Sequence, residues 1–154
     1  MLTVSLVVCA MVALATADDP AGDHPHTNVA TCPANWKQHN NRCYYFESST
    51  KNWADAETQC QTMGGNLVSI HADDEHKFLQ TLTQTQAWIG GSGCQMPGSF
   101  FWIDGTAMAN TFWCPQKPDN TLSECCIQTN SQAGKCWDDV SCDTLLPFVC
   151  ARHL

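Results

Sequence analysis

Apolar positions in the first half of the chain follow the spacing of a strand and then of a helix. The aromatic-rich run RCYYFES, residues 42–48, is typical of a strand. Residues 49–65 then place apolar side chains on one face of a helix, and the Gly64-Gly65 pair ends the pattern. The residues on that face are Trp53, Ala56, Cys60 and Met63.

The next segments repeat this order of strand and helix. Residues 66–70, NLVSI, predict a short strand. Residues 72–82 predict a second helix whose first turn holds three acidic side chains, which interact favourably with the helix dipole. The apolar side chains that face inward from this helix are Phe78, Leu79 and Leu82.

From residue 87 onward the pattern changes to short apolar runs that Gly, Pro, Asn and Asp interrupt. Such runs predict strands joined by long loops. Helices early in the chain, with strands and loops later, indicate an α+β domain with segregated elements. The runs are AWIGG, FFWIDG, FWC, CCIQT, KCWDDV and PFVCA.

The N-terminal residues form an apolar run that ends in ATA, a small-x-small pattern that signal peptidase cleaves. We therefore expect a signal peptide at residues 1–17 and a secreted protein. A membrane anchor is the alternative, but the run is shorter than the roughly 20 residues that a bilayer span needs. Residues 18–31 hold two prolines and one large aliphatic side chain, which predicts a flexible leader or propeptide. The folded domain is expected at residues 32–154.

Length and charge limit the classes of function. With 154 residues and 44% hydrophobic residues, the chain has enough material for one domain with one core. The formal charge is −8, and the acidic residues are spread along the chain. Nucleic acid, which needs a basic stripe for its phosphates, is therefore not an expected partner. Anionic membrane surfaces are disfavoured for the same reason.

Cysteine content indicates a cross-linked extracellular domain. The chain has 11 cysteines, of which Cys9 lies in the expected signal peptide. The others form an even set, which in a secreted domain predicts five disulfides. A structural zinc site is the alternative, but the sequence has no Cys-x-x-Cys pair. An even count also argues against a subunit that is disulfide-linked to a partner, so we expect a monomer.

Cys125 and Cys126 are adjacent and cannot easily bond to each other. Neighbouring Cα atoms are about 3.8 Å apart, whereas a relaxed disulfide needs roughly 4.4–6.8 Å. On a strand, the two side chains would point to opposite faces of the sheet. We therefore expect one bridge to hold the sheet and the other to hold the loop region.

The sequence contains no motif of a familiar catalytic class. It has neither a Gly-x-Ser-x-Gly elbow nor a His-Glu-x-x-His motif, and oxidised cysteines cannot act as nucleophiles. His71 and His76 remain as candidates, and because acidic residues occupy positions 73–75 we interpret both as surface residues. The sequence therefore predicts a protein without enzymatic activity.

Several motifs together resemble a C-type lectin-like domain over residues 32–154. They are CPANW, RCYYF, WADAETQC, GGNLVSIH, AWIGG, KPD, CWDDVSC and PFVCA. Within that superfamily, the adjacent cysteines in SECCIQT and the GKCWDD stretch resemble fish type II antifreeze proteins. The resemblance implies a secreted protein that binds ice and inhibits crystal growth. The alternative that it implies is a soluble calcium-dependent lectin for galactose-type carbohydrate.

This resemblance implies a disulfide pattern in which three bridges are common to many lectin-like domains and two are additional. The implied pairs are Cys32–Cys43, Cys60–Cys150, Cys126–Cys142, Cys94–Cys125 and Cys114–Cys136. The adjacent cysteines thus take different partners, in agreement with the distance argument.

The resemblance also implies positions for one calcium ion, and four of the five positions carry an oxygen ligand here. The positions are Lys117, Asp119, Glu124, Asp138 and Asp139. Calcium takes six to eight oxygen ligands, and the ammonium of Lys117 has no lone pair to give. Either this ammonium replaces the ion, or it turns outward while the four carboxylates bind calcium. In a third interpretation, the three later acids only end a strand or face solvent.

The segment around Pro118 is the candidate binding loop for ice or sugar. Galactose-type relatives have an aromatic platform just after the Pro-Asp pair, and no aromatic residue follows here. Small side chains on a rigid surface could instead hold ordered water, because a rigid surface loses less entropy on binding. The resemblance implies ice contact through this loop in calcium-dependent relatives and through a different face in calcium-independent ones. The candidate residues are Lys117, Asp119, Asn120, Thr121, Leu122 and Ser123.

Overall fold

One mixed sheet and two helices make up the described part of the chain. The computed structural model describes residues 30–119, 121 and 123–154, so the expected signal peptide and most of the expected leader lie outside it. The elements are β1 (Lys37–His39), β2 (Arg42–Lys51), α1 (Trp53–Thr62), β3 (Asn66–Leu67), α2 (Asp73–Leu82), β4 (Ala87–Ser92), β5 (Phe101–Trp102), β6 (Cys126–Ser131), β7 (Cys136–Val140) and β8 (Leu146–His153). No helix within these residues is long and apolar enough to cross a membrane. The predicted α+β class is confirmed.

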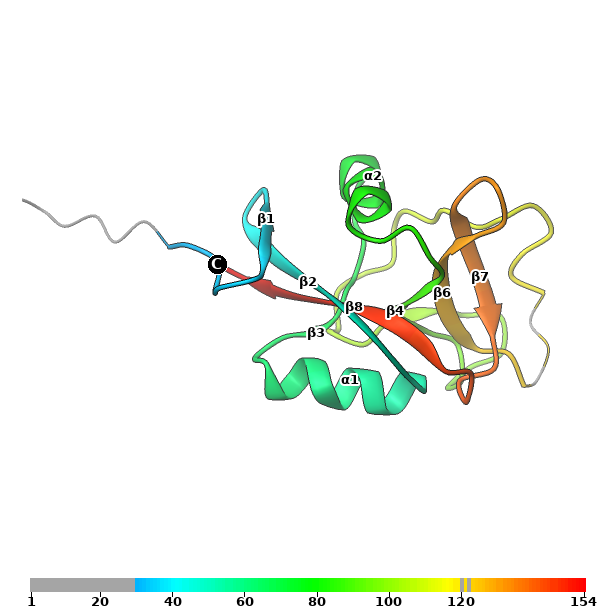
Figure 1. The fold of residues 1–154 in the computed structure, drawn as a ribbon. Coiled ribbons are helices and arrows are strands. Elements are labelled where there is room, and N and C mark those ends of the chain that lie inside the picture. Colours follow the sequence, from blue (N-terminus) through cyan, green and yellow to red (C-terminus); the bar gives the residue numbers. More distant parts are fainter. Residues whose placement is uncertain (1–29, 120, 122) are drawn as a thin grey trace, which may run out of the picture.

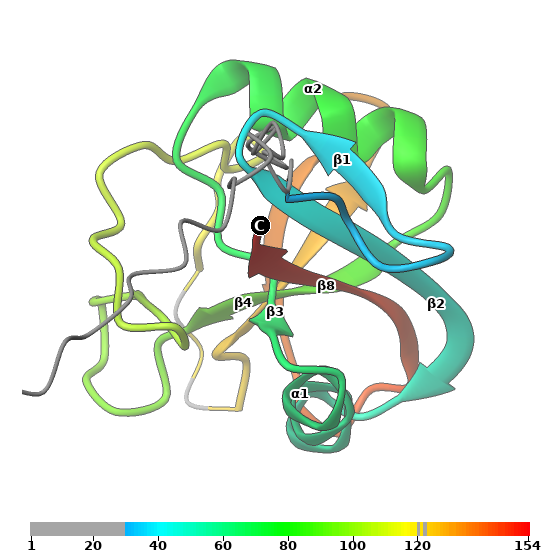
Figure 2. The ribbon, with the colours of Figure 1, turned by 90° about the vertical axis from the view of Figure 1, so that its left-hand side faces the viewer.

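Strands that are distant in the sequence meet in a sheet of order β1-β2-β8-β4-β6-β7, with β3 beside β8 and β5 beside β4. The pairs are antiparallel except for β4 with β8. Helices α1 and α2 lie on opposite sides of the long β2–β8 pair (Figure 1), and the view turned by 90° shows the same arrangement (Figure 2). The loop half, with β6 and β7, lies at the end of the molecule away from the C-terminus.

Local chemistry sets the ends of α1. The side chain of Asn52 accepts a hydrogen bond from the Asp55 N–H at 2.8 Å, which caps the helix and starts it at Trp53. The helix was predicted from residue 49, but residues 49–51 extend β2 instead. At the other end, Gly64 has a φ of 78°, a left-handed conformation that glycine adopts without steric cost.

The second strand and helix of the prediction are also present. α2 spans Asp73–Leu82, within the predicted range of 72–82. The strand predicted at residues 66–70 is shorter, because only Asn66–Leu67 is assigned to β3 beside β8. The chain nevertheless stays close to β8, since the Val68 N–H donates to the carbonyl of Val149 at 2.9 Å.

Aromatic rings fill the core on the α2 side of the sheet. Trp137 on β7 is fully buried, and its ring lies 5.4 Å from that of Trp102, 5.3 Å from Phe112 and 5.8 Å from Trp113. All three contacts are edge-on, a geometry that aromatic pairs prefer. This cluster fixes the long loops before and after β5 onto β7.

All five disulfides that the resemblance implied are present. Cys125 bonds to Cys94, and Cys126 bonds to Cys142, yet these four sulfurs lie within 4.8 Å of one another. The expectation that the two side chains point to opposite faces of a strand was therefore wrong. The Cys126 bridge nevertheless holds the sheet through β6, and the Cys125 bridge holds the loop region. Cys125 precedes β6, so the alternation of side chains along a strand does not apply to it. Because all four sulfurs are oxidised, the group has no thiolate to offer a metal.

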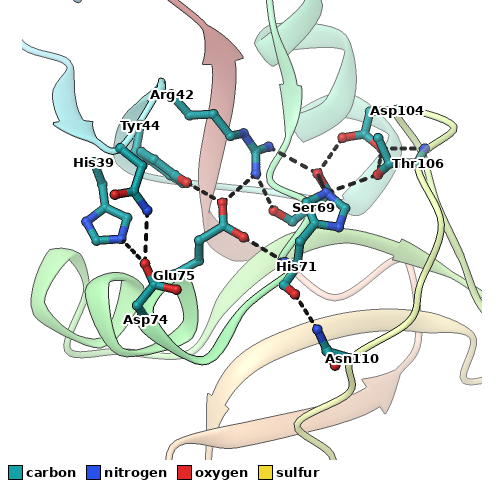
Figure 3. A network of polar contacts seen from close by, with 11 residues as sticks. His39, Arg42, Tyr44, Ser69, His71, Asp74, Glu75, Asp104, Thr106 and Asn110 are labelled. Atoms are coloured by element: carbon teal, nitrogen blue, oxygen red, sulfur yellow. Dashed lines mark hydrogen bonds and ion pairs between the residues drawn. The ribbon is translucent and has the colours of Figure 1, made fainter.

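Glu75 at the start of α2 joins the β1–β2 hairpin to the rest of the domain (Figure 3). Its carboxylate accepts hydrogen bonds from the Tyr44 hydroxyl at 2.8 Å, the His71 backbone N–H at 2.7 Å and the Arg42 guanidinium at 3.0 Å. Burial alone would raise the pKa of Glu75, but the hydrogen bonds and the Arg42 charge outweigh burial and lower it. The ionised carboxylate thus links three segments of the chain.

The interpretation of His76 as a surface residue was wrong. His76 is only 7% exposed, and its ring stacks on that of Phe112 with centroids 4.3 Å apart. It lies one turn before Leu79 and so shares the inward face of α2. Burial lowers the pKa of His76, although the nearby charge of Asp73 opposes this. His71 is half-buried and contacts the Ser69 hydroxyl at 3.0 Å.

We expect the stabilising effect of His76 to decrease in acid. The folded protein keeps this ring neutral below the ordinary histidine pKa of 6.5, whereas the unfolded chain takes up a proton there. The free energy of unfolding of the wild type, relative to His76→Gln, should therefore fall as the pH drops from about 7.5 to about 5.5. Denaturant unfolding at several pH values measures it. His153→Gln, at an exposed position, is the matched control, and a pH-independent difference at position 76 would contradict the prediction.

Candidate functional site

The segment that carries the candidate site is anchored at both ends. At its start, Cys114 bonds covalently to Cys136, and the Cys114 N–H donates to the carbonyl of Trp137 at 2.9 Å. At its end, Cys125 is bonded to Cys94, and its carbonyl accepts from the Gly93 N–H at 2.7 Å. Residues 117–124, which lie between these anchors, form the binding loop. The anchors hold it in place, although its described residues, 117–119, 121, 123 and 124, have no regular secondary structure.

Lys117 points into the group of carboxylates that the sequence singled out. Its ammonium lies 2.8 Å from Asp119 Oδ2, 3.0 Å from Asp138 Oδ1 and 4.0 Å from Asp139 Oδ1. The Asp119 N–H also donates to Asp139 Oδ1 at 3.2 Å. We call these four residues the Lys117 cluster. It joins the binding loop to β7, which carries both of the later aspartates.

The Lys117 cluster is mostly shielded from water. The Lys117 side chain is 21% exposed and that of Asp138 is 15% exposed, while Asp139 is fully buried. Hydrogen bonding to Asp119 and the charge and hydrogen bond of Asp138 raise the pKa of Lys117 above its ordinary value, although burial opposes this. The same ammonium lowers the pKa of the Asp119 carboxyl. Lys117 and Asp119 are therefore both charged at neutral pH.

Glu124 connects the Lys117 cluster to the polar tip of the binding loop, since its interaction with Asp119 contributes to the lowered pKa of that carboxyl. The Glu124 carboxylate accepts a hydrogen bond from the Thr121 hydroxyl at 2.9 Å, and the Glu124 N–H donates to the Thr121 carbonyl at 3.0 Å. Thr121 and Ser123 are exposed. Asn120 and Leu122 lie outside the described residues.

In this arrangement the candidate ligands do not fit a calcium ion. Three of the four predicted acids gather around Lys117, and the fourth, Glu124, instead accepts from Thr121. Among the described residues, no three carboxylates bring oxygens within 4.8 Å of one another. A cation that needs six to eight oxygens would also have to displace the ammonium from its ion pairs. The assignment of Asp119, Glu124, Asp138 and Asp139 as metal ligands remains a prediction that this geometry does not favour.

A family model for the lectin C-type domain matches residues 49–152. This chain belongs to the C-type lectin domain family. The match covers both helices and all strands except β1, most of β2 and the last residue of β8, so the predicted fold is confirmed. Members of this family are binding modules rather than enzymes, which agrees with the expectation that the protein has no catalytic activity.

Antifreeze proteins are among the most similar members of the family. The chain is 45% identical over 160 residues to the type-2 ice-structuring protein of Hemitripterus americanus, and the match covers 98% of each chain. A calcium-dependent type II antifreeze protein in its calcium-free form is 45% identical, with a TM-score of 0.77, over 79% of this chain and 99% of that one. A calcium-independent type II antifreeze protein is 39% identical, with a TM-score of 0.79, over 83% of this chain and 98% of that one. Similarity alone therefore does not decide the role of calcium.

The sequence did not decide which way the Lys117 side chain points. The sequence allowed the ammonium either to replace a metal or to turn outward, and in the structure it points inward. The sequence indicated only that a lysine lies two residues before an acid, Asp119. The ion pairs of Lys117 with Asp138 and Asp139 span 21 and 22 residues along the chain, so local sequence does not specify them.

We expect Lys117→Gln to destabilise the protein by about 2 kcal/mol, because the buried Asp138 oxygen loses its counter-ion. Added calcium should then raise the melting temperature of this variant and leave that of the wild type unchanged. Differential scanning calorimetry with and without calcium measures both effects. Lys77→Gln is the matched control, since the Lys77–Asp73 pair is exposed and local. A calcium-stabilised wild type would contradict the interpretation of Lys117 as the resident cation.

Proposed function

We propose that this protein is a secreted antifreeze protein that binds ice and inhibits crystal growth without calcium. Support for secretion comes from the N-terminal apolar run and from five disulfides, which persist in oxidising compartments. Support for ice as the ligand comes from the likeness to ice-structuring proteins over nearly the full chain. The observation that carries calcium independence is the Lys117 cluster.

Sugar binding by this fold would require a metal ion with free coordination positions, and the Lys117 cluster does not provide one. The ammonium has its ion-pair partners within the protein and sits below the loop surface. An ammonium can donate hydrogen bonds but cannot accept the paired hydroxyls of a sugar ring as a metal does. In addition, the residues that follow Asp119 include no aromatic ring on which galactose could stack.

Ice sets different requirements, which the binding loop meets. Ice is a neutral, repeating lattice of water, so its receptor needs a fixed surface and no strong charge that holds water in another orientation. Thr121 and Ser123 offer short exposed hydroxyls, and the hydrogen bond from Thr121 to Glu124 restrains the loop from inside. Two disulfides at its ends limit the entropy that would be lost on adsorption.

The direct test measures thermal hysteresis and ice-crystal shape for the oxidised, mature protein, with and without a chelator. We expect growth arrest of equal size in both conditions, because the cation of the loop is part of the chain. A second arm passes the protein over immobilised galactose with calcium present. Retention on the column without growth arrest would establish the lectin alternative, and arrest that the chelator abolishes would refute calcium independence.

A substitution at the tip of the binding loop tests its contact with ice. Ser123→Arg should lower thermal hysteresis at equal protein concentration roughly threefold, because a guanidinium must shed water to approach the lattice. Ser49→Arg on the exposed part of β2 is the matched control and should keep wild-type hysteresis. Melting temperatures of both variants should remain within a few degrees of the wild type, as expected for exposed sites. Equal hysteresis for both variants would remove the loop tip from the ice-contacting surface.

A further inference from the structure

A long stretch of this acidic protein is almost free of charge. Between Phe78 and Gln116 the only charged residue is Asp104, although the whole chain has 15 acidic and 7 basic residues. This neutral segment includes α2's C-terminal end, β4, β5 and the loops on either side of β5. Its loops are largely exposed, so burial in the core does not account for the absence of charge.

Three of the four exposed large hydrophobic side chains in the described residues lie close together in the neutral segment. Met96 and Phe101 are each 49% exposed and Ile103 is 37% exposed. Single apolar side chains on a surface are ordinary, but three within eight residues form a patch of the kind that marks an interaction site. We call these three residues the apolar patch.

The backbone of β5 explains why two of these side chains face outward together. Trp102 pairs with Gly91 and Phe101 pairs with Ser92, and the Ile103 N–H donates to the carbonyl of Gly90 at 2.8 Å. Along an extended strand, alternate side chains point to opposite faces, so Phe101 and Ile103 share one face while Trp102 takes the other. Trp102 is 3% exposed.

The inward face of β5 packs against the core, which holds the strand rigidly. The Trp102 ring packs edge-on against Trp137 at 5.4 Å in the aromatic core. Ile103 lies against Gly90, where an added Cβ would come within 3.0 Å of its Cγ2 atom. The outward face of the strand is therefore a fixed surface rather than a flexible loop.

The one charge of the neutral segment is turned into the protein. The Asp104 carboxylate accepts hydrogen bonds from the Ser69 hydroxyl and from the backbone N–H of Thr106 at 3.0 Å (Figure 3). The Thr106 hydroxyl also contacts His71 Nε2 at 3.2 Å, and Asn110 donates to the His71 carbonyl. Asp104 thus shapes the loop after β5 and does not place a solvated charge beside the apolar patch.

The neutral segment is joined directly to the binding loop. The Cys94–Cys125 disulfide links the two, and the Gly93 N–H donates to the Cys125 carbonyl at 2.7 Å. A cleft of about 160 Å³ lies between them, with Pro97 and Phe100 on one wall and Thr121 and Glu124 on the other. The two segments therefore keep a fixed spacing.

We infer that the ice-contacting surface extends beyond the binding loop onto the apolar patch of Met96, Phe101 and Ile103. This inference rests on the proposed antifreeze function and adds a second segment to its surface. Ice is the occupant that fits, because the strand that carries Phe101 is packed against the core, no charged residue occurs from 78 to 103, and a disulfide joins this segment to the binding loop. Apolar side chains release ordered water when they are covered, while the neutral surroundings carry no strongly held hydration shell to remove.

The test introduces one lysine at a time into the apolar patch. Phe101→Lys and Ile103→Lys should each lower thermal hysteresis roughly threefold at equal concentration and should lower the fraction of protein taken up by a slowly growing ice crystal, because the ammonium must be desolvated on adsorption. Leu145→Lys is the matched control, since Leu145 is a large hydrophobic residue that is 63% exposed outside the neutral segment. It should retain wild-type values.

A neutral variant keeps the test decisive if a lysine prevents folding. The double variant Phe101→Ala, Ile103→Ala should lower hysteresis about twofold, because it removes apolar contact area without adding charge, while Leu145→Ala should not. Melting curves verify that each variant is folded.

Three outcomes would overturn the inference in distinguishable ways. If the wild type and the patch variants show equal thermal hysteresis, the apolar patch is not part of the ice-contacting surface, and the proposed function is unaffected. A dimer in sedimentation that Ile103→Lys dissociates, with hysteresis unchanged, would make the patch an interface between copies of this chain. A wild type that fails to inhibit ice growth would refute both the inference and the proposed function.

Discussion

Covalent anchoring of the irregular half is the constraint on which the rest of this structure depends. Between β5 and β6 the chain runs for more than twenty residues, and those that the structure describes include no helix or strand. Such segments do not hold a shape by backbone hydrogen bonds alone. Here two disulfides fix the middle and the end of the segment, since Cys114 is bonded to β7 and Cys125 to the loop after β4. Each bridge contributes about 2–4 kcal/mol, mainly by restricting the unfolded chain. The disulfides thus set the position of the loop, and its side chains do not have to hold it in place and can contact a ligand.

A lysine offsets part of the carboxylate charge beneath the binding loop. An ion pair at 3.0 Å gains roughly 5 kcal/mol at an intermediate effective dielectric constant, before the cost of desolvation is subtracted. A calcium ion would bring twice the charge, but it would have to be drawn from solution and given six or more oxygens. The ammonium is tethered to the backbone beside Pro118, so it is present in every folded molecule. If the proposed calcium independence holds, local order around the three aspartates does not vary with the concentration of divalent ions.

Local patterns predicted those elements whose stability comes from nearby residues. Both helices could be located because their apolar faces repeat within a few residues, and the α1 cap at Asn52 decided only where the first one begins. The disulfide pairs came from resemblance, since spacing alone leaves the connectivity open. Two features depend on distant contacts and could not be predicted. His76 is buried by Phe112 from another segment, and Lys117 points inward because aspartates of β7 lie beneath it. The end of β2 was also predicted wrongly. No strong turn signal marks residues 49–51, which extend the strand instead of starting the helix.

The distribution of charge separates the part of the molecule that must stay soluble from the part that must adsorb. A protein with a formal charge of −8 is kept apart from its copies by repulsion, and its solubility needs that charge somewhere on the surface. The neutral segment carries almost none of it, and in the binding loop Lys117 and Asp119 are paired within the fold. A uniformly charged surface would keep its own hydration shell against any lattice, whereas a uniformly neutral one would aggregate. Placing the acidic residues on the remainder of the chain satisfies both demands, because repulsion acts between molecules over about 10 Å at moderate salt while adsorption depends on atoms in direct contact.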